Sequence, residues 1–184
     1  MARIAVLLAE GFEEVEAVTP IDFLRRAGVE VVIAGVGGRT VTGSHGITIT
    51  ADLAISELAG ESLEGIVLPG GMPGSVNLAA SPEVRRLVES TLSSGRLLGA
   101  ICAAPARVLA PMGLLSGRRA TCFPGEESAF GADVEFSEER VVRDGNLITS
   151  RGAGTAAEFA EELIRFLLGA AAANEIHLRT VQKS

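Results

Sequence analysis

The strongest constraint on the fold is a series of short, largely apolar runs separated by segments with helical patterns. Residues 4–9, 65–68 and 97–101 are continuously apolar, and residues 29–34 form a β-branched run that includes Glu30. A strand that helices cover on both faces is apolar throughout, whereas a half-exposed strand alternates between apolar and polar residues. Because strands and helices alternate without an internal repeat, the sequence predicts an α/β fold with a doubly wound, mostly parallel sheet sandwiched by helices.

The segments between and after these runs have the features of helices and short strands. Residues 13–27 place Val18, Ile21 and Leu24 on one helical face, and Pro20 within them predicts a kink. Further helices are predicted at 82–93 and 103–109, after Thr155 and beyond Gly169, with a loop through Gly74. Short strands are predicted at 40–42, 47–50, 134–136, 140–143 and 147–149.

Length, charge and cysteine content limit the classes of protein that fit. The 184 residues predict a single domain, residues 1–184. Sixteen basic and 23 acidic residues give a net charge of −7, which disfavours nucleic acid and anionic membrane surfaces as partners. Two cysteines indicate free thiols in a reducing compartment, so we expect a cytoplasmic protein. The apolar stretch 97–115 contains Gly, Pro and Arg, so no membrane span is expected.

The fold class predicts where a ligand binds. In doubly wound folds ligands lie beyond the carboxyl ends of the strands, which here brings together residues 10–16, residues 70–74 and Cys102. Cys102 stands between small residues at a sharp strand-to-helix turn, as in a nucleophile elbow, and helix-start N–H groups there are expected to lower its pKa. The alternative is that Cys102 is a small buried apolar residue.

Acids and glycines at the same sheet edge supply further candidates. Glu10, Glu13, Glu14 and Glu16 follow the first strand, and one that faces the thiol would be desolvated and hold a proton near neutral pH. Sequence alone does not choose among these four acids, most of which are expected to be solvated. The N–H groups of the Gly70-Gly71 pair suit an oxyanion, although the pair also fits a simple tight turn.

Several kinds of site lack support in the sequence. No glycine-rich nucleotide fingerprint occurs, so no cofactor is predicted. Only two histidines, His45 and His177, and two widely separated cysteines are present, so no metal site is predicted. Cys122 is expected to be a core residue.

Five segments in order resemble the DJ-1/PfpI superfamily, in particular its small DJ-1/YajL branch, also called ThiJ. The resemblance extends from end to end and implies a single DJ-1/PfpI domain with a flavodoxin-like fold. The segments are Glu10-Gly11-Phe12-Glu13-Glu14-Val15-Glu16, Arg25-Arg26-Ala27-Gly28, Leu68-Pro69-Gly70-Gly71, Ala100-Ile101-Cys102-Ala103-Ala104-Pro105 and Thr149-Ser150-Arg151-Gly152-Ala153-Gly154-Thr155.

The resemblance assigns roles to particular residues. It implies that Cys102 is the nucleophile and that Glu16 is the acid beside it. The oxyanion-binding amides of the family fall on Gly71 and Ala103, with Gly70 adjacent in the same turn. The resemblance also implies a homodimer.

Other positions depart from the family or carry an alternative interpretation. The arginine near the family's anion pocket falls on Arg26, which also suits a helix C-terminal cation. An arginine that some members contribute from the partner subunit aligns with His45, so an anion contact across the dimer would be weaker or pH-dependent. Phe123 replaces a histidine of many members, and Ala103 replaces the histidine of the protease-like branch, which disfavours peptidase activity.

The leading functional hypothesis is a glutathione-independent glyoxalase that converts a small α-oxoaldehyde such as methylglyoxal to lactate without a cofactor. Release of early glycation adducts, a deglycase activity, would use the same groups. The alternative hypothesis is an oxidative-stress sensor or redox chaperone in which Cys102 is oxidised to a sulfinate held by protonated Glu16.

Overall fold

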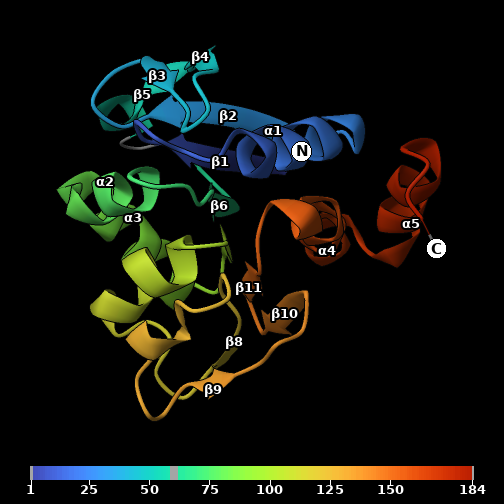
Figure 1. Ribbon diagram of the computed structural model, residues 1–184. Coiled ribbons are helices and arrows are strands. Elements are labelled where there is room, and N and C mark those ends of the chain that lie inside the picture. The colour runs from blue at the N-terminus through green and yellow to red at the C-terminus, as the bar shows by residue number, and fades with distance from the viewer. Residues whose placement is uncertain (1, 59–61, 184) are drawn as a thin grey trace.

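The computed structural model describes residues 2–58 and 62–183 and has one large sheet at its centre (Figure 1). Its strand order is β10-β11-β7-β6-β1-β2-β5, and every neighbouring pair is parallel except β10 with β11. The strands are β1 Arg3–Leu8, β2 Glu30–Gly35, β5 Leu53–Ala54, β6 Gly65–Leu68, β7 Leu97–Ile101, β10 Val141–Asp144 and β11 Leu147–Ser150. The prediction of a doubly wound, mostly parallel sheet is confirmed.

Helices cover both faces of this sheet, which explains why its strands are apolar throughout. Alternate residues of β1 enter different cores: Ile4 packs with the helices of one face and Leu7 with those of the other. The first face is covered by α1 Glu14–Arg26, α4 Ala156–Leu168 and α5 Ala170–Arg179, and the second by α2 Gly74–Ala80 and α3 Pro82–Ser93. The four residues of β6 and the five of β7 are therefore buried throughout, whereas the edge strand β10 keeps exposed and half-exposed residues.

Smaller elements complete the fold. An antiparallel hairpin, β3 Thr40–Thr42 with β4 Thr48–Thr50, and a parallel pair, β8 Arg119–Ala120 with β9 Glu135–Phe136, lie outside the large sheet. Short helical turns span Ile55–Leu58, Pro105–Leu109, Ala110–Met112, Glu127–Ala129 and Ala153–Thr155. In the described residues, none of the helices combines the length and apolar character needed to cross a bilayer.

Two predicted segments differ from the structure. The segment from Gly74, expected to be a loop, is the helix α2. Two hydrogen bonds hold this helix: Gly74 N–H donates to the Gly11 carbonyl, and the Asn77 side chain donates to the Glu10 carbonyl. The expected helix at 103–109 is instead a π-helical turn at Pro105–Leu109 followed by a 3₁₀ turn. Contacts with distant segments, rather than local propensity, decide both elements.

Candidate active site around Cys102

Cys102 occupies a sharp turn directly after β7. Its φ of 64° lies in the left-handed region, which non-glycine residues seldom adopt. The turn is held on both sides, because Cys102 N–H donates to the Ser150 carbonyl at 2.9 Å and Phe123 N–H donates to the Cys102 carbonyl at 2.8 Å. This strained backbone matches the geometry expected of a nucleophile elbow.

Glu16 is the acid that meets the thiol. It lies in the first turn of α1 with 1% of its surface exposed, and its Oε2 accepts a 2.9 Å hydrogen bond from Gly70 N–H. The Cys102 thiol donates a second hydrogen bond to this carboxylate. Burial raises the pKa of Glu16 to about 7 although both hydrogen bonds lower it, and the charge of Glu13 adds to the rise. Glu16 is thus suited to hold or release a proton near neutral pH.

The sulfur of Cys102 faces two backbone donors, the N–H groups of Ala103 and Gly71. The sequence predicts a lowered pKa for this thiol, and that prediction is wrong for the state in which Glu16 is ionised. Burial, the Glu16 charge and the hydrogen bond to Glu16 together outweigh both N–H groups and raise the pKa of the Cys102 thiol to about 12. Protonation of Glu16 removes its negative charge and leaves the two N–H donors in place, so the thiol and the carboxyl act as one coupled acid.

Glycines leave the space that this pair fills. A Cβ on Gly70 would lie 2.5 Å from Cys102 Cβ and 2.6 Å from Glu16 Oε2. Gly71 has a φ of 92°, a conformation that glycine adopts without strain. On the opposite side, a Cβ on Gly152 would lie 3.4 Å from the Phe123 ring and 3.9 Å from Glu16 Oε1. The ring of Phe123, 47% exposed, therefore lies beside the site where many family members carry an imidazole.

Arg26 is not part of this cluster. It is the last residue of α1, ten residues beyond Glu16, and a rise of 1.5 Å per residue separates the two by about 15 Å along the helix. Its Nε instead contacts Asp22 Oδ2 at 2.6 Å, near the helix C-terminus. The structure therefore favours the alternative interpretation of Arg26 as a helix C-terminal cation.

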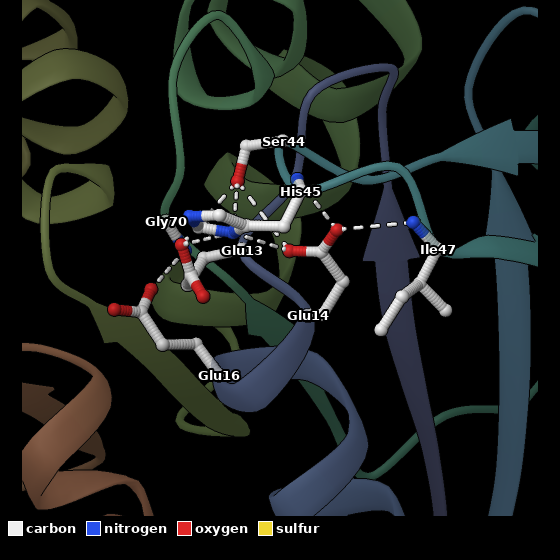
Figure 2. Close-up of polar contacts among 7 residues, drawn as sticks. All are labelled: Glu13, Glu14, Glu16, Ser44, His45, Ile47 and Gly70. Carbon is white, nitrogen blue, oxygen red and sulfur yellow. Dashed lines mark hydrogen bonds and ion pairs between the residues drawn. The ribbon is translucent and has the colours of Figure 1, made fainter.

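His45 lies on the hairpin loop and contacts acids at the start of α1 (Figure 2). Its Nδ1 is 3.0 Å from Glu14 Oε2 and 3.5 Å from Glu13 Oε2. The hydrogen bond to Glu14, followed by the charges of Glu13 and Glu14, raises the pKa of His45. An anion contact across a dimer stays a prediction, since within its own chain the ring is engaged by these two carboxylates.

Glu14 is a structural acid that sequence reasoning missed. It is one of the four acids of which most are expected to be solvated, yet it is 5% exposed and accepts hydrogen bonds from the N–H groups of His45 and Ile47 at 2.7 and 3.3 Å. Burial raises its pKa, but the bonds from the His45 ring and these N–H groups outweigh burial and lower the pKa to about 2. A Cβ on Gly43 would collide with this carboxylate, so Gly43 is the one sequence signal of its position.

Metal-ligating side chains gather at one place in the described parts of the chain. Glu13, Glu14 and His45 offer ligand atoms that lie within 4.8 Å of one another. His45 lies 31 residues from Glu14 in the chain, so the fold rather than local sequence brings the group together. The absence of a metal site stays a prediction. Cys122, by contrast, is fully buried in the core, as predicted.

The chain is similar to a known protein family, to curated proteins and to solved structures. The family model described as DJ-1/PfpI family matches residues 2–166. The protein dj-1beta of Drosophila melanogaster is 41% identical over 173 residues, which are 93% of this chain and 92% of that protein. A solved structure of oxidized Toxoplasma gondii DJ-1 has a TM-score of 0.96 and 37% identity, with 100% of both chains covered.

Two further relatives carry names that describe an activity. A deglycase of Pyrococcus abyssi is 34% identical over 167 residues, covering 90% of this chain and 99% of that protein. The glutathione-independent glyoxalase DJR-1.2 of Caenorhabditis elegans is 32% identical over 175 residues, covering 95% and 93%. Some relatives are longer, since the chain spans 40% of the length of the Arabidopsis thaliana protein DJ-1 homolog B.

Proposed function

This chain belongs to the DJ-1/PfpI family, and from that premise we propose that it is a cofactor-independent glyoxalase that converts methylglyoxal to lactate. The observation that carries the proposal is the contact between the Cys102 thiol and a buried glutamate whose pKa is raised to about 7. Relatives named as a glyoxalase and as a deglycase support an activity of this class.

The first step uses the coupled proton of the pair. The Cys102 proton passes to Glu16, and the thiolate sulfur attacks the aldehyde carbon to form a hemithioacetal. The N–H groups of Gly71 and Ala103, which face the sulfur, are placed to donate to the oxygen that becomes negative. The proton then on Glu16 is available to neutralise that oxygen.

The second step moves hydrogen between the two carbons of the substrate. Ionised Glu16 takes the proton from the former aldehyde carbon, and an enediol-like intermediate forms. Return of that proton to the neighbouring carbon gives a thioester, which water hydrolyses to lactate and the free thiol. Only water is added overall, and no external oxidant or reductant is consumed, because the aldehyde is oxidised as the ketone is reduced.

The neighbours of Glu16 on the side of Gly152 are apolar. A Cβ on Gly152 would lie within 4 Å of both the Phe123 ring and Glu16 Oε1, so an apolar ring lies close to the carboxyl. Glu16 is the one side chain that hydrogen-bonds the thiol within the described residues, and it therefore carries the proton transfers alone. Release of a glycation adduct from a protein amine would begin with the same thiolate and the same amides.

Conversion of methylglyoxal is the direct test. Purified protein is incubated with methylglyoxal without added thiol, and lactate is followed by NMR beside Cys102→Ser and Glu16→Gln. We expect lactate from the parent, none from Cys102→Ser, and a rate at least about 100-fold lower from Glu16→Gln, as for loss of a general acid–base group. The glyoxalase hypothesis is refuted if the parent makes no lactate while mass spectrometry shows that Cys102 is reduced.

A redox sensor is the second candidate function, favoured by the raised pKa of Glu16. A protonated carboxyl can donate a hydrogen bond to a sulfinate on Cys102 as well as to a carbonyl oxygen. Sensing predicts stoichiometric oxidation of Cys102 by peroxide and negligible lactate formation. Intact-mass analysis of a peroxide titration, run beside the lactate assay, separates the two functions.

We also propose a homodimer that forms through the outer face of α1 and the adjoining hairpin. Val15, Val18 and Ile47 are 47%, 46% and 57% exposed, and Ile47 is tied to the start of α1 through Glu14. Apolar side chains gathered on one face favour a partner surface. Light scattering is expected to give twice the chain mass for the parent and the chain mass for Val18→Glu.

A further inference from the structure

We propose that Ser44, His45, Glu13 and Glu14 form a binding site for one divalent transition-metal ion of the Zn²⁺ type. Figure 2 shows these side chains converging from two segments, the start of α1 and the hairpin loop that follows β3. Neither Cys102 nor Glu16 is among these residues, and the proposal does not depend on the proposed reaction.

The geometry of four polar atoms carries the proposal. Ser44 Oγ lies 3.1 Å from His45 Nδ1, 3.3 Å from Glu13 Oε2 and 3.4 Å from Glu14 Oε2. His45 Nδ1 lies 3.5 Å from Glu13 Oε2 and 3.0 Å from Glu14 Oε2. These five distances are close to the edge of about 3.3 Å of a regular tetrahedron whose centre lies about 2.0 Å from each corner, the Zn–N and Zn–O bond length. The ligand atoms of the two carboxylates lie within 4.8 Å of each other.

The ligand types fit the same class of ion. Two carboxylates and an imidazole nitrogen suit Zn²⁺ and its neighbours in the transition series, and the Ser44 hydroxyl or a water can occupy the fourth position. His45 binds through Nδ1 with its proton on Nε2, and its side chain is 69% exposed in the single chain.

Charge and rigidity favour the ion over water. The Glu14 carboxylate is buried, with a side-chain exposure of 7%. Its Oε1 is already held by two backbone N–H groups, which leaves Oε2 directed at the centre of the cluster. A divalent ion therefore neutralises two nearby carboxylates at a site that the fold has already positioned.

A second histidine in the chain supplies a matched control. His177 Nδ1 also lies 3.0 Å from a carboxylate, Glu161 Oε1, but no second carboxylate joins that pair among the residues that the structure describes. A single histidine–carboxylate pair offers too few ligands for a transition-metal site. Loss of His45 should abolish specific binding, whereas loss of His177 should not.

Titration calorimetry with ZnCl₂ tests the site in chelator-treated protein that carries Cys102→Ser, so that the thiol contributes nothing. We expect one ion per chain, a loss of affinity of at least about 10-fold in His45→Gln and Glu13→Gln, and no change in His177→Gln. In the Co²⁺-loaded protein, visible absorption of tetrahedral intensity is expected, and it should be lost in His45→Gln.

Four results would overturn the proposal. In the Cys102→Ser protein they are no saturable binding of either ion, unchanged binding in His45→Gln, and equal loss in His177→Gln. In protein that retains Cys102, the fourth is saturable Zn²⁺ binding that is lost in Cys102→Ser and unchanged in His45→Gln, which would assign the ion to the thiol. Circular dichroism of each variant checks folding, and the 69% exposure of the His45 side chain favours a folded His45→Gln.

Discussion

Replacing Glu16 with glutamine tests whether Cys102 and Glu16 act as one coupled acid. In the parent, burial raises the pKa of Glu16 to about 7, and burial together with the Glu16 charge raises the pKa of the Cys102 thiol to about 12. The pair therefore loses its first proton near the lower value and its second near the upper one. At pH values between these two pKa values the pair carries one negative charge. That charge is divided between the sulfur and the carboxylate in a ratio that does not depend on pH.

The size of the effect follows from these two values. Alkylation by iodoacetamide reports the thiolate, whose population follows the singly ionised state of the pair. With a first pKa of about 7, that state increases roughly 50-fold from about pH 5 to pH 7 but only about 1.3-fold from about pH 7.5 to pH 9.5. The parent should therefore show a rise followed by a long plateau.

The variant should behave differently because glutamine has no proton to exchange. Without the Glu16 charge, burial still raises the thiol pKa and the N–H groups of Ala103 and Gly71 still lower it. The alkylation rate of Glu16→Gln then follows a single ionisation and increases about tenfold per pH unit up to the pKa of the thiol. The step near pH 7 disappears from its profile.

The assay measures the rate of modification of Cys102 from about pH 5 to pH 10, with peptide mass spectrometry to exclude the fully buried Cys122. A parent profile with one midpoint near pH 9 and no plateau would refute the coupled pair. A Glu16→Gln profile that keeps the step near pH 7 would show that another group causes it. Either result would remove the physical basis for a proton carried by Glu16.

Three further predictions concern the free energy of unfolding. Gly70→Ala, whose Cβ would lie 2.5 Å from Cys102 Cβ, should lower the free energy of unfolding by about 1–3 kcal/mol in urea melts. Gly154→Ala, which meets nothing within 4 Å, should change it by less than about 0.5 kcal/mol, and equal effects would contradict the packing argument. From about pH 5 to pH 8, the free energy of unfolding of Glu16→Gln should increase by about 2–3 kcal/mol relative to that of the parent. The reason is that the raised folded-state pKa of Glu16 stabilises the parent fully below pH 4.5, and this stability is lost as the pH rises through about 7. A difference between parent and variant in urea melts that does not change with pH would refute this. Glu14→Gln should cost about 1.5–3 kcal/mol at pH 7, since it removes a charged acceptor of several hydrogen bonds. The lowered pKa of Glu14 gives stability that is present above pH 4.5 and lost as the pH falls through about 2. The free energies of unfolding of the parent and Glu14→Gln should therefore become equal at low pH. A difference that persists at low pH would contradict the role of the ionised carboxylate.

The sequence could predict the sheet and the location of the thiol because both depend on local pattern. A continuous apolar run such as β6 indicates burial on both faces, and Cys102 follows directly from the end of β7. It could not predict α2, whose seven residues begin with glycine and are held by contacts to Gly11 and Glu10. Short elements of this kind depend on tertiary contacts that no local pattern encodes.

The choice among the four acids was undetermined for a related reason. Glu16 is distinguished by Gly70, 54 residues away, and Glu14 by the loop that contains His45. The thiol pKa was misjudged because the N–H donors follow from the turn, whereas the burial of the thiol and the effect of an ionised Glu16 on it require the three-dimensional arrangement. Electrostatic properties of a site thus require the positions of all its charges, not only those adjacent in sequence.

A shared proton also links the two candidate functions. Above about pH 7 the same singly ionised pair supplies the thiolate that attacks either an aldehyde or a peroxide, so the two reactants compete for one population of Cys102. Reaction with the aldehyde is reversible and ends in hydrolysis that restores the thiol, whereas oxidation to the sulfinate removes Cys102 from the cycle. Turnover should therefore protect Cys102 from peroxide in proportion to the fraction held as hemithioacetal. A protein selected only as a sensor has no reason to show such protection, because nothing in sensing requires a carbonyl substrate to occupy the site.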